Sequence, residues 1–228
     1  IPTIPGFLQA GAVDMLVAEA EAQKHNAYFT TSSHNVYLSK PRPDLDTSHV
    51  LNRQIISSKG CITTDQVPEK SGLKVIYNAP EFQKFIAMIV GEPALYEYAD
   101  PLSSINVHYA DEGQELGWHF DNSEFAITLL LQAPQSGGQF EFVRDLRNDE
   151  DDKMNFSGVT TVLDGKAVVE RPAVTQGTLM LFQGRNALHR VTPTIGRTTR
   201  ILVVFAYNAE PGIVLSEAAR MTFFGRLG

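Results

Sequence analysis

The second half of the chain consists of short apolar segments, each a few residues long and bounded by turn residues. Pairs such as Gly137-Gly138 and Asp164-Gly165 separate these segments and are typical of tight turns between strands. Regularly spaced short strands predict a β-sandwich or a jelly roll rather than a helical bundle. The segments predicted as strands are 104–109, 125–132, 139–143, 159–163, 178–182 and 201–207.

The first half has a different pattern. Apolar residues recur at helical spacing over 8–24, and a second apolar stripe starts at Pro80 and ends at Gly91. Between them, 28–46 is rich in Thr, Ser, Asn and Pro, which predicts a long irregular connection and a candidate lid. We therefore expect one domain, mainly β with flanking helices, with helices and the lid over 1–95, the β core over 96–211 and a C-terminal segment over 212–228.

The composition excludes several kinds of partner. The chain has 228 residues, 43% hydrophobic and 20% charged, as in globular domains. Its net charge of −7 and the lack of a basic stripe argue against nucleic acid, and no apolar run approaches the ~20 residues of a membrane span. The single cysteine, Cys61, cannot form an internal disulfide, so we expect a cytoplasmic protein. The sequence begins at Ile1, which leaves a removed leader open.

His119 and Asp121 lie two residues apart at the head of the run 117–142, where a strand is predicted to begin. On an extended chain this spacing puts both side chains on one face. With a second histidine from a distant strand they would form a two-histidine, one-carboxylate set, which binds non-haem Fe(II) and leaves three metal positions open. Six histidines and 26 acidic residues in 228 give roughly 0.7 such pairs by chance, so the motif depends on its context.

Two residues further along supply that context. His189 lies between the segments that end at 182 and begin at 201, and it is the candidate third ligand. Arg200 precedes the apolar run 201–205, and an arginine entering a buried strand needs an anionic partner because an unpaired buried cation costs several kcal/mol. A carboxylate bound through two hydrogen bonds would meet that need. Arg197, beside Gly196 in a predicted turn, is the rival candidate.

Taken together, these segments resemble the Fe(II)/2-oxoglutarate-dependent oxygenases over roughly 100–210. The matching segments, in order, are Gly117-Trp-His119-Phe-Asp121, Gly137-Gly-Gln-Phe-Glu-Phe142, Gly177-Thr-Leu-Met-Leu-Phe182, Leu188-His189-Arg-Val191 and Arg200. The resemblance implies a double-stranded β-helix (jelly roll, cupin-like) with iron held by His119, Asp121 and His189. It also implies that 2-oxoglutarate chelates the metal, that its far carboxylate pairs with Arg200, and that 2-oxoglutarate is converted to succinate and CO2 with oxygen as the oxidant.

The resemblance is less close on the preceding segment. Family members often carry Asn and Tyr two residues apart there, in contact with the cosubstrate, whereas this chain has Asn106 and His108. The same-face spacing still implies that Asn106 and His108 contact 2-oxoglutarate, with ordinary strand hydrogen bonding as the alternative. Tyr109 would point to the other face. Trp118 is equally compatible with packing and with substrate contact.

The phrase Trp-His-Phe-Asp-Asn-Ser-Glu-Phe over 118–125 and the compact length resemble the BesD/HalD-type branch, which acts on free amino acids. Its halogenating members carry a small residue at the carboxylate position, which leaves a metal site for chloride, but this chain has Asp121. The resemblance therefore implies hydroxylation, or desaturation or cyclisation, of a small free amino acid. Arg53 and Asn122 are the candidates to bind its carboxylate, with a surface ion pair as the alternative for Arg53.

Two other readings of the same residues stay open. An oxygenase acting on a protein or peptide side chain would have an extended groove instead of a closed pocket. A non-catalytic β-helix protein that binds a metal or ligand would usually lack one of the ligands or the arginine. The substrate, the carbon oxidised and the oligomeric state are left undetermined.

Overall fold

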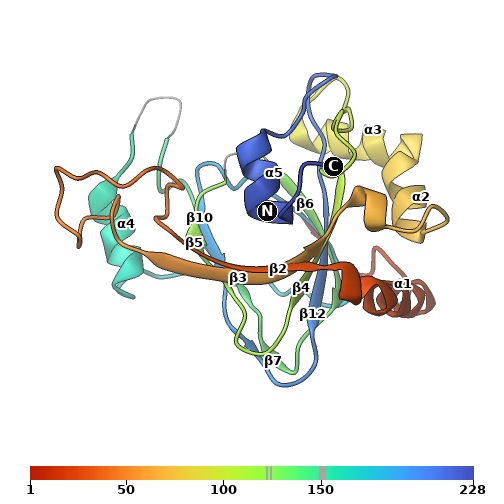
Figure 1. Cartoon of the computed structure of the whole chain (residues 1–228), viewed down its shortest axis with the longest axis horizontal. Helices are drawn as coiled ribbons and strands as arrows, with labels where there is room; N and C mark the ends of the chain where they lie inside the picture. The colour runs from red at the N-terminus through yellow and green to blue at the C-terminus, as the bar shows by residue number, and fades with distance from the viewer. Residues whose placement is uncertain (122, 124, 149–152) are drawn as a thin grey trace.

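The computed structural model describes residues 1–121, 123, 125–148 and 153–228, which form an antiparallel sheet with helices on its outer side (Figure 1). The strands of the main sheet are β1 (Thr3–Ile4), β2 (Tyr28–His34), β3 (Ile55–Ile62), β4 (Ile105–Ala110), β5 (Leu116–His119), β6 (Ala126–Gln132), β8 (Phe140–Val143), β9 (Leu179–Phe182), β10 (Leu188–Val191) and β12 (Arg200–Phe205). A small second sheet pairs β7 (Ser136–Gly137) with β11 (Thr194–Ile195).

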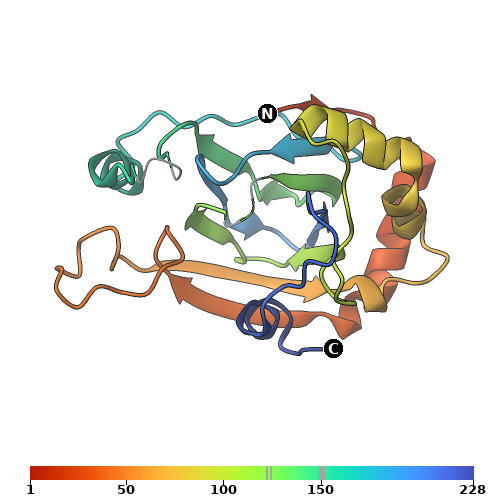
Figure 2. The same cartoon turned by 90° about the horizontal axis from the view of Figure 1, so that it is seen from above.

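The main sheet rolls up on itself. Its strand order is β1-β9-β6-β12-β4-β3-β5-β10-β8, with β2 paired to β3. Strands β8 and β9 are far apart in this order, yet the rings of Phe140 and Phe182 pack at 4.9 Å, so the two ends of the sheet meet. This closure, visible from above in Figure 2, confirms the predicted double-stranded β-helix, or jelly roll.

Five α-helices lie around the described part of the roll: α1 (Ala10–Gln23), α2 (Gly72–Asn78), α3 (Pro80–Val90), α4 (Phe156–Leu163) and α5 (Glu217–Phe224). Helices α1, α2 and α3 cover the outer face of the sheet (Figures 1 and 2). Alternate strand residues point outward into this core, including Val107, Leu129 and Val203. Their neighbours in sequence face the interior of the roll, which leaves that interior free for a polar site.

Most predicted elements are confirmed, with ends shifted by a few residues. The helix predicted over 8–24 is α1, and the one starting at Pro80 is α3, which ends at Gly91 in a left-handed conformation (φ 81°). The segments 104–109, 125–132, 139–143, 178–182 and 201–207 correspond to β4, β6, β8, β9 and β12. None of the described helices is both long enough and apolar enough to cross a membrane.

Two predictions about local structure are wrong. The segment 159–163 is helix α4 instead of a strand, because Asn155 caps it by accepting a hydrogen bond from the Gly158 N–H, and Val159 and Val162 are buried at helical spacing. The segment 28–46 begins as strand β2, paired along its whole length with β3, and only its second part is irregular. The region 1–95 thus contributes three strands to the sheet besides its helices.

Candidate metal centre

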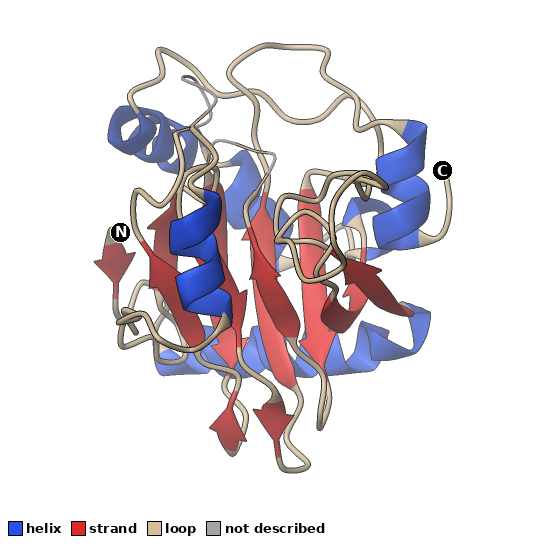
Figure 3. Cartoon of the chain, turned by 90° about the vertical axis from the view of Figure 1, so that its left-hand side faces the viewer, coloured by secondary structure: helices blue, strands red, loops and turns tan. Residues whose placement is uncertain are grey.

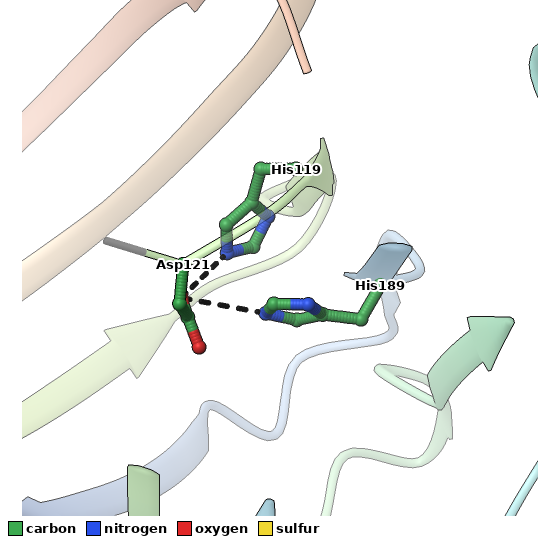
Figure 4. Close-up of side chains that lie close together, drawn as sticks. All are labelled: His119, Asp121 and His189. Atoms are coloured by element: carbon green, nitrogen blue, oxygen red, sulfur yellow. Dashed lines mark ion pairs between the residues drawn. The ribbon is translucent and has the colours of Figure 1, made fainter. Parts of the chain in front are cut away.

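Two histidines and one aspartate converge inside the roll. His119 ends β5 and faces His189 directly on the antiparallel neighbour β10, with ring centres 4.1 Å apart. Asp121 follows β5 after one residue, and its Oδ1 lies 3.5 Å from the Nε2 of each histidine (Figure 4). The three residues form a possible metal-binding group whose ligand atoms all lie within 4.8 Å of one another. The motif therefore ends a strand, whereas the sequence pattern had placed it at the start of one.

The same kind of hydrogen bond, from Nδ1 to a backbone carbonyl oxygen, fixes both histidines in the same tautomer. His119 Nδ1 lies 2.7 Å from the Gly117 carbonyl oxygen and His189 Nδ1 lies 2.9 Å from the Ala187 carbonyl oxygen. Because a carbonyl oxygen only accepts, each Nδ1 carries the proton and each Nε2 presents its lone pair. Such outer hydrogen bonds are how proteins orient metal-binding imidazoles. The residues present therefore fit a divalent metal ion.

The charge states suit the same role. Burial lowers the pKa of His119, and the neighbouring His189 lowers it further, which favours the neutral ring that a metal requires. Burial alone would raise the pKa of Asp121, but the positive charge of His189 and His119 in their protonated state lowers it by more, so this pKa lies well below its usual range and the carboxylate is ionised. The group thus offers two Nε2 atoms and one carboxylate as ligands.

The loop that carries Asp121 is fixed by backbone contacts. The Phe120 N–H donates to the Val36 carbonyl oxygen (2.8 Å), and the Asp121 N–H donates to the Gly184 carbonyl oxygen (3.1 Å). Gly184 is required here because a Cβ at that position would lie 1.9 Å from Asp121 Oδ2. The sequence analysis did not identify Gly184 as a site residue, since its role depends on contact with a loop 63 residues away.

Arg147 is a second residue that the sequence analysis missed. Its Nε donates to the Arg185 carbonyl oxygen (2.6 Å), and its guanidinium also reaches the Asp121 carbonyl oxygen (3.3 Å). The guanidinium carbon lies 4.4 Å from the centre of the Phe120 ring. Arg147 therefore connects the Asp121 loop to the segment that leads into His189.

Arg200 begins β12 and faces the interior of the roll. It is 9% exposed, and burial lowers its pKa to about 10, which leaves the guanidinium charged at neutral pH. Among the residues that the structure describes, no carboxylate pairs with Arg200. Its rival Arg197 lies instead in the turn before β12, where its backbone N–H donates to Gln135 Oε1.

Asn106 and His108 share the inner face with Arg200, because Asn106 pairs with Val204, His108 with Leu202, and Arg200 with Ala110. The Asn106 amide donates to the carbonyl oxygens of Leu102 (2.9 Å) and Ile105 (3.0 Å). His108 contacts Lys59 of β3, a residue that the sequence analysis did not identify. As predicted, Tyr109 points to the outer face.

The candidates for substrate binding are placed less favourably. Arg53 forms an ion pair with Asp164 (2.8 Å) and donates to the Leu163 carbonyl oxygen, which is the alternative given for it above. Asn122 lies outside the residues that the structure describes. Trp118 is 7% exposed and packs in a second core, a hydrophobic cluster that also contains Phe120 and Val159. The Arg190 guanidinium lies 4.8 Å from the centre of its ring.

A cavity of about 810 Å³ opens beside Asp121. Tyr37, Lys40 and Arg42 from the irregular segment after β2 form one wall, and Arg147 and residues near the start of α4 form another. Loops gather at this end of the roll, as Figure 3 shows. Of the three converging residues, Asp121 lines this cavity, so the cavity leads to one side of the metal-binding group.

The roll and its His-Asp-His group define the class as a Fe(II)/2-oxoglutarate-dependent oxygenase, an enzyme that uses iron, 2-oxoglutarate and oxygen. A family model described as halogenase D matches residues 52–220, and the chain belongs to this family. A search of curated proteins finds no match.

Solved structures share the fold. A 2-oxoglutarate-Fe(II) oxygenase family protein from Burkholderia pseudomallei is 14% identical, with 92% of this chain and 86% of that chain covered and a TM-score of 0.54. The α-ketoglutarate-dependent epimerase SnoN of nogalamycin biosynthesis is 13% identical, with 90% and 76% covered and a TM-score of 0.58. A Pseudomonas putida prolyl-4-hydroxylase is 13% identical, with 90% of both chains covered and a TM-score of 0.51.

Proposed function

We propose that His119, Asp121 and His189 bind Fe(II), that Arg200 binds the far carboxylate of 2-oxoglutarate, and that the enzyme hydroxylates a C–H bond of a small free amino acid or derivative. When bound, iron and 2-oxoglutarate would supply the oxidising chemistry together with O2: one oxygen atom goes to succinate, which forms with CO2 from 2-oxoglutarate, and the other goes to the substrate. The observation that carries the proposal is the convergence of two Nε2 lone pairs and one carboxylate beside a cavity. Asn106 and His108, on the same inner face as Arg200, complete the proposed cosubstrate pocket.

Asp121 favours oxidation without halogen transfer. A carboxylate oxygen at 3.5 Å from both Nε2 atoms needs only a small movement to share one ion with them. It then occupies a coordination position that a halide would require. Within a family described as halogenase D, this chain therefore fits a hydroxylase, or an enzyme of desaturation or cyclisation.

The size of the cavity favours a small substrate. Its volume of about 810 Å³ lies within the roughly 300–1,000 Å³ of small-molecule sites. Tyr37, Ser39 and Lys40 line it from the segment after β2, so movement of this segment would open and close the cavity. Closure would exclude water from the reacting centre.

The test supplies Fe(II), 2-oxoglutarate, oxygen and excess chloride with a panel of free amino acids, and follows product masses. The expected product gains one oxygen or loses two hydrogens, and Asp121→Ala abolishes turnover while keeping the fold. A chlorinated product from the unmodified protein would overturn the argument from Asp121. Turnover confined to residues within peptides would instead support the oxygenase of protein side chains.

A further inference from the structure

Lys59 lies on the inner face of β3, next to His108 on β4. Its Nζ is 2.9 Å from Nε2 and 3.1 Å from Nδ1 of the His108 ring. The two strands pair with Gly60 opposite Tyr109 and Cys61 opposite His108, so Lys59 falls beside Ala110. On the other side of β4, Arg200 pairs with Ala110. Lys59 and Arg200 therefore flank one small residue in a single row across three strands.

No ion pair balances the positive charge in this row among the described residues: burial lowers the pKa of Lys59, and the more distant Asp121 carboxylate only partly offsets this. Burial, then Lys59 and then Arg200 lower the pKa of His108 well below its usual range, so both cations are close to it and the ring is neutral at neutral pH. A neutral ring accepts a hydrogen bond from Lys59 without balancing its charge. Within the described residues, no carboxylate forms an ion pair with Lys59 or Arg200. A buried guanidinium and a half-buried ammonium without an ion-pair partner are costly to keep charged, and burial lowers the pKa of both.

The geometry lets both side chains reach one ligand group. Neighbouring strands are about 4.8 Å apart, so the Cα atoms of Lys59 and Arg200, two strands apart, are separated by roughly 10 Å. The only side chain between them on β4 is the methyl group of Ala110. Gly138 makes room for the arginine, since a Cβ there would lie 2.8 Å from Arg200 Cδ. Both long side chains can thus converge above Ala110.

We infer that Lys59 and Arg200 together bind the far carboxylate of the cosubstrate, and that this cation pair makes the enzyme selective for 2-oxo dicarboxylates over 2-oxo monocarboxylates. The inference rests on the proposed function, because it concerns the same cosubstrate pocket. It adds a cation from β3 to the single arginine considered so far. It also explains why Lys59 lies against His108 inside the roll: an anionic ligand would balance the charges of Lys59 and Arg200.

The test measures binding without turnover, by calorimetry on the Ni(II)-loaded protein. The two probes are 2-oxoglutarate and 2-oxopentanoate, which has the same chain length but no far carboxylate. Lys59→Met should raise the Kd for 2-oxoglutarate by about 10- to 150-fold, the range for one charged hydrogen bond, and leave the Kd for 2-oxopentanoate unchanged. The Tm of the ligand-free variant should not fall, because a half-buried ammonium without an ion-pair partner is removed. Lys166→Met, at an exposed ion pair with Asp164, is the matched control and should change neither Kd.

Each other outcome has a definite meaning. An unchanged Kd for 2-oxoglutarate in Lys59→Met, with binding lost in Arg200→Met, overturns the inference and keeps the proposed function. Unchanged binding in both variants overturns the proposed cosubstrate site as well. Equal weakening of both probes would place Lys59 at the metal-binding end of the ligand and refute the cation pair. If Lys59→Met does not fold, Lys59→Gln removes the charge and retains a donor for His108, with the same expected ratio of the two Kd values.

Discussion

Replacing Gly184 by alanine is expected to weaken metal binding by displacing Asp121. The added Cβ would lie 1.9 Å from Asp121 Oδ2 and 2.5 Å from its Cγ. Non-bonded carbon and oxygen atoms approach to roughly 3.3 Å, so one of the two segments has to move by more than about 1 Å. Metal sites tolerate deviations of only about 0.2 Å in ligand distance. A shift of this size therefore removes Asp121 from productive geometry.

The expected magnitude follows from two effects. Inserting a methyl group into a packed site costs about 1–3 kcal/mol, and disturbing the support of a metal ligand typically lowers metal affinity by about 10- to 100-fold. The backbone of Gly184 does not adopt the left-handed conformation, so alanine introduces no strain there apart from this contact. We expect the Kd for Ni(II) or Co(II) to rise by about 10- to 100-fold in Gly184→Ala.

The assay is metal titration by calorimetry, combined with urea unfolding, in a double-mutant cycle with Asp121→Gly. Removing the carboxylate removes the clash, so the methyl group should have little effect on either quantity in that background. Gly11→Ala is the control: nothing lies within 4 Å of its new Cβ in α1, so stability should rise by up to about 1 kcal/mol with metal binding unchanged. Native metal affinity in Gly184→Ala, or an equal penalty without the carboxylate, would refute the reasoning.

Two further predictions concern charged residues. Arg200→Lys keeps the charge but loses the two-pronged geometry, so calorimetry should show 2-oxoglutarate binding weakened by about 1.5–3 kcal/mol; a loss in Arg197→Ala instead would transfer the role. Glu141 is 2% exposed and accepts hydrogen bonds from Arg171 and Arg190 at 2.6 and 2.7 Å. Burial raises the pKa of Glu141, but the two arginines lower it by more, so the pKa lies below its ordinary value of 4.5. The ionised carboxylate therefore stabilises the fold fully above about pH 4.5, and this stabilisation is lost as the pH falls through the lowered pKa. Glu141→Gln should therefore reduce the free energy of unfolding by about 1–3 kcal/mol at pH 7 and flatten its decrease in acid; parallel pH profiles in urea titrations would contradict this.

The parts of the fold that the sequence predicted are those whose signal is local. Strands such as β6 and β12 carry apolar residues that face the helices, so their composition identifies them. The metal motif was also recognisable, because His119 and Asp121 need only a two-residue spacing. The position of the motif at the end of a strand could not be predicted. Strand β5 ends at His119 because it pairs with β10, whose residues lie about 70 positions away in the sequence.

Local signals also misled where two of them competed. The segment 159–163 is rich in β-branched residues, which favour strands, and it is nevertheless helical. Thr160 and Thr161 donate their hydroxyl hydrogens to the carbonyl oxygens four residues earlier, so both hydroxyl groups are satisfied within the helix. The burial of Val159 and Val162 in the second core then decides the conformation.

Strand β3 escaped prediction for a reason connected with the proposed chemistry. Its inward residues include Ser57 and Lys59, so the inner face of the strand is polar where an ordinary core strand would be apolar. Ser57 accepts the Gly117 N–H at 3.0 Å, and the Gly117 carbonyl oxygen in turn orients His119. A strand that binds an anion and supports a metal ligand cannot also present a continuous apolar face, so hydrophobic patterning fails where the site is built. The polar residues that mask the strand pattern of β3 in the sequence are the ones that face the metal centre in the rolled sheet.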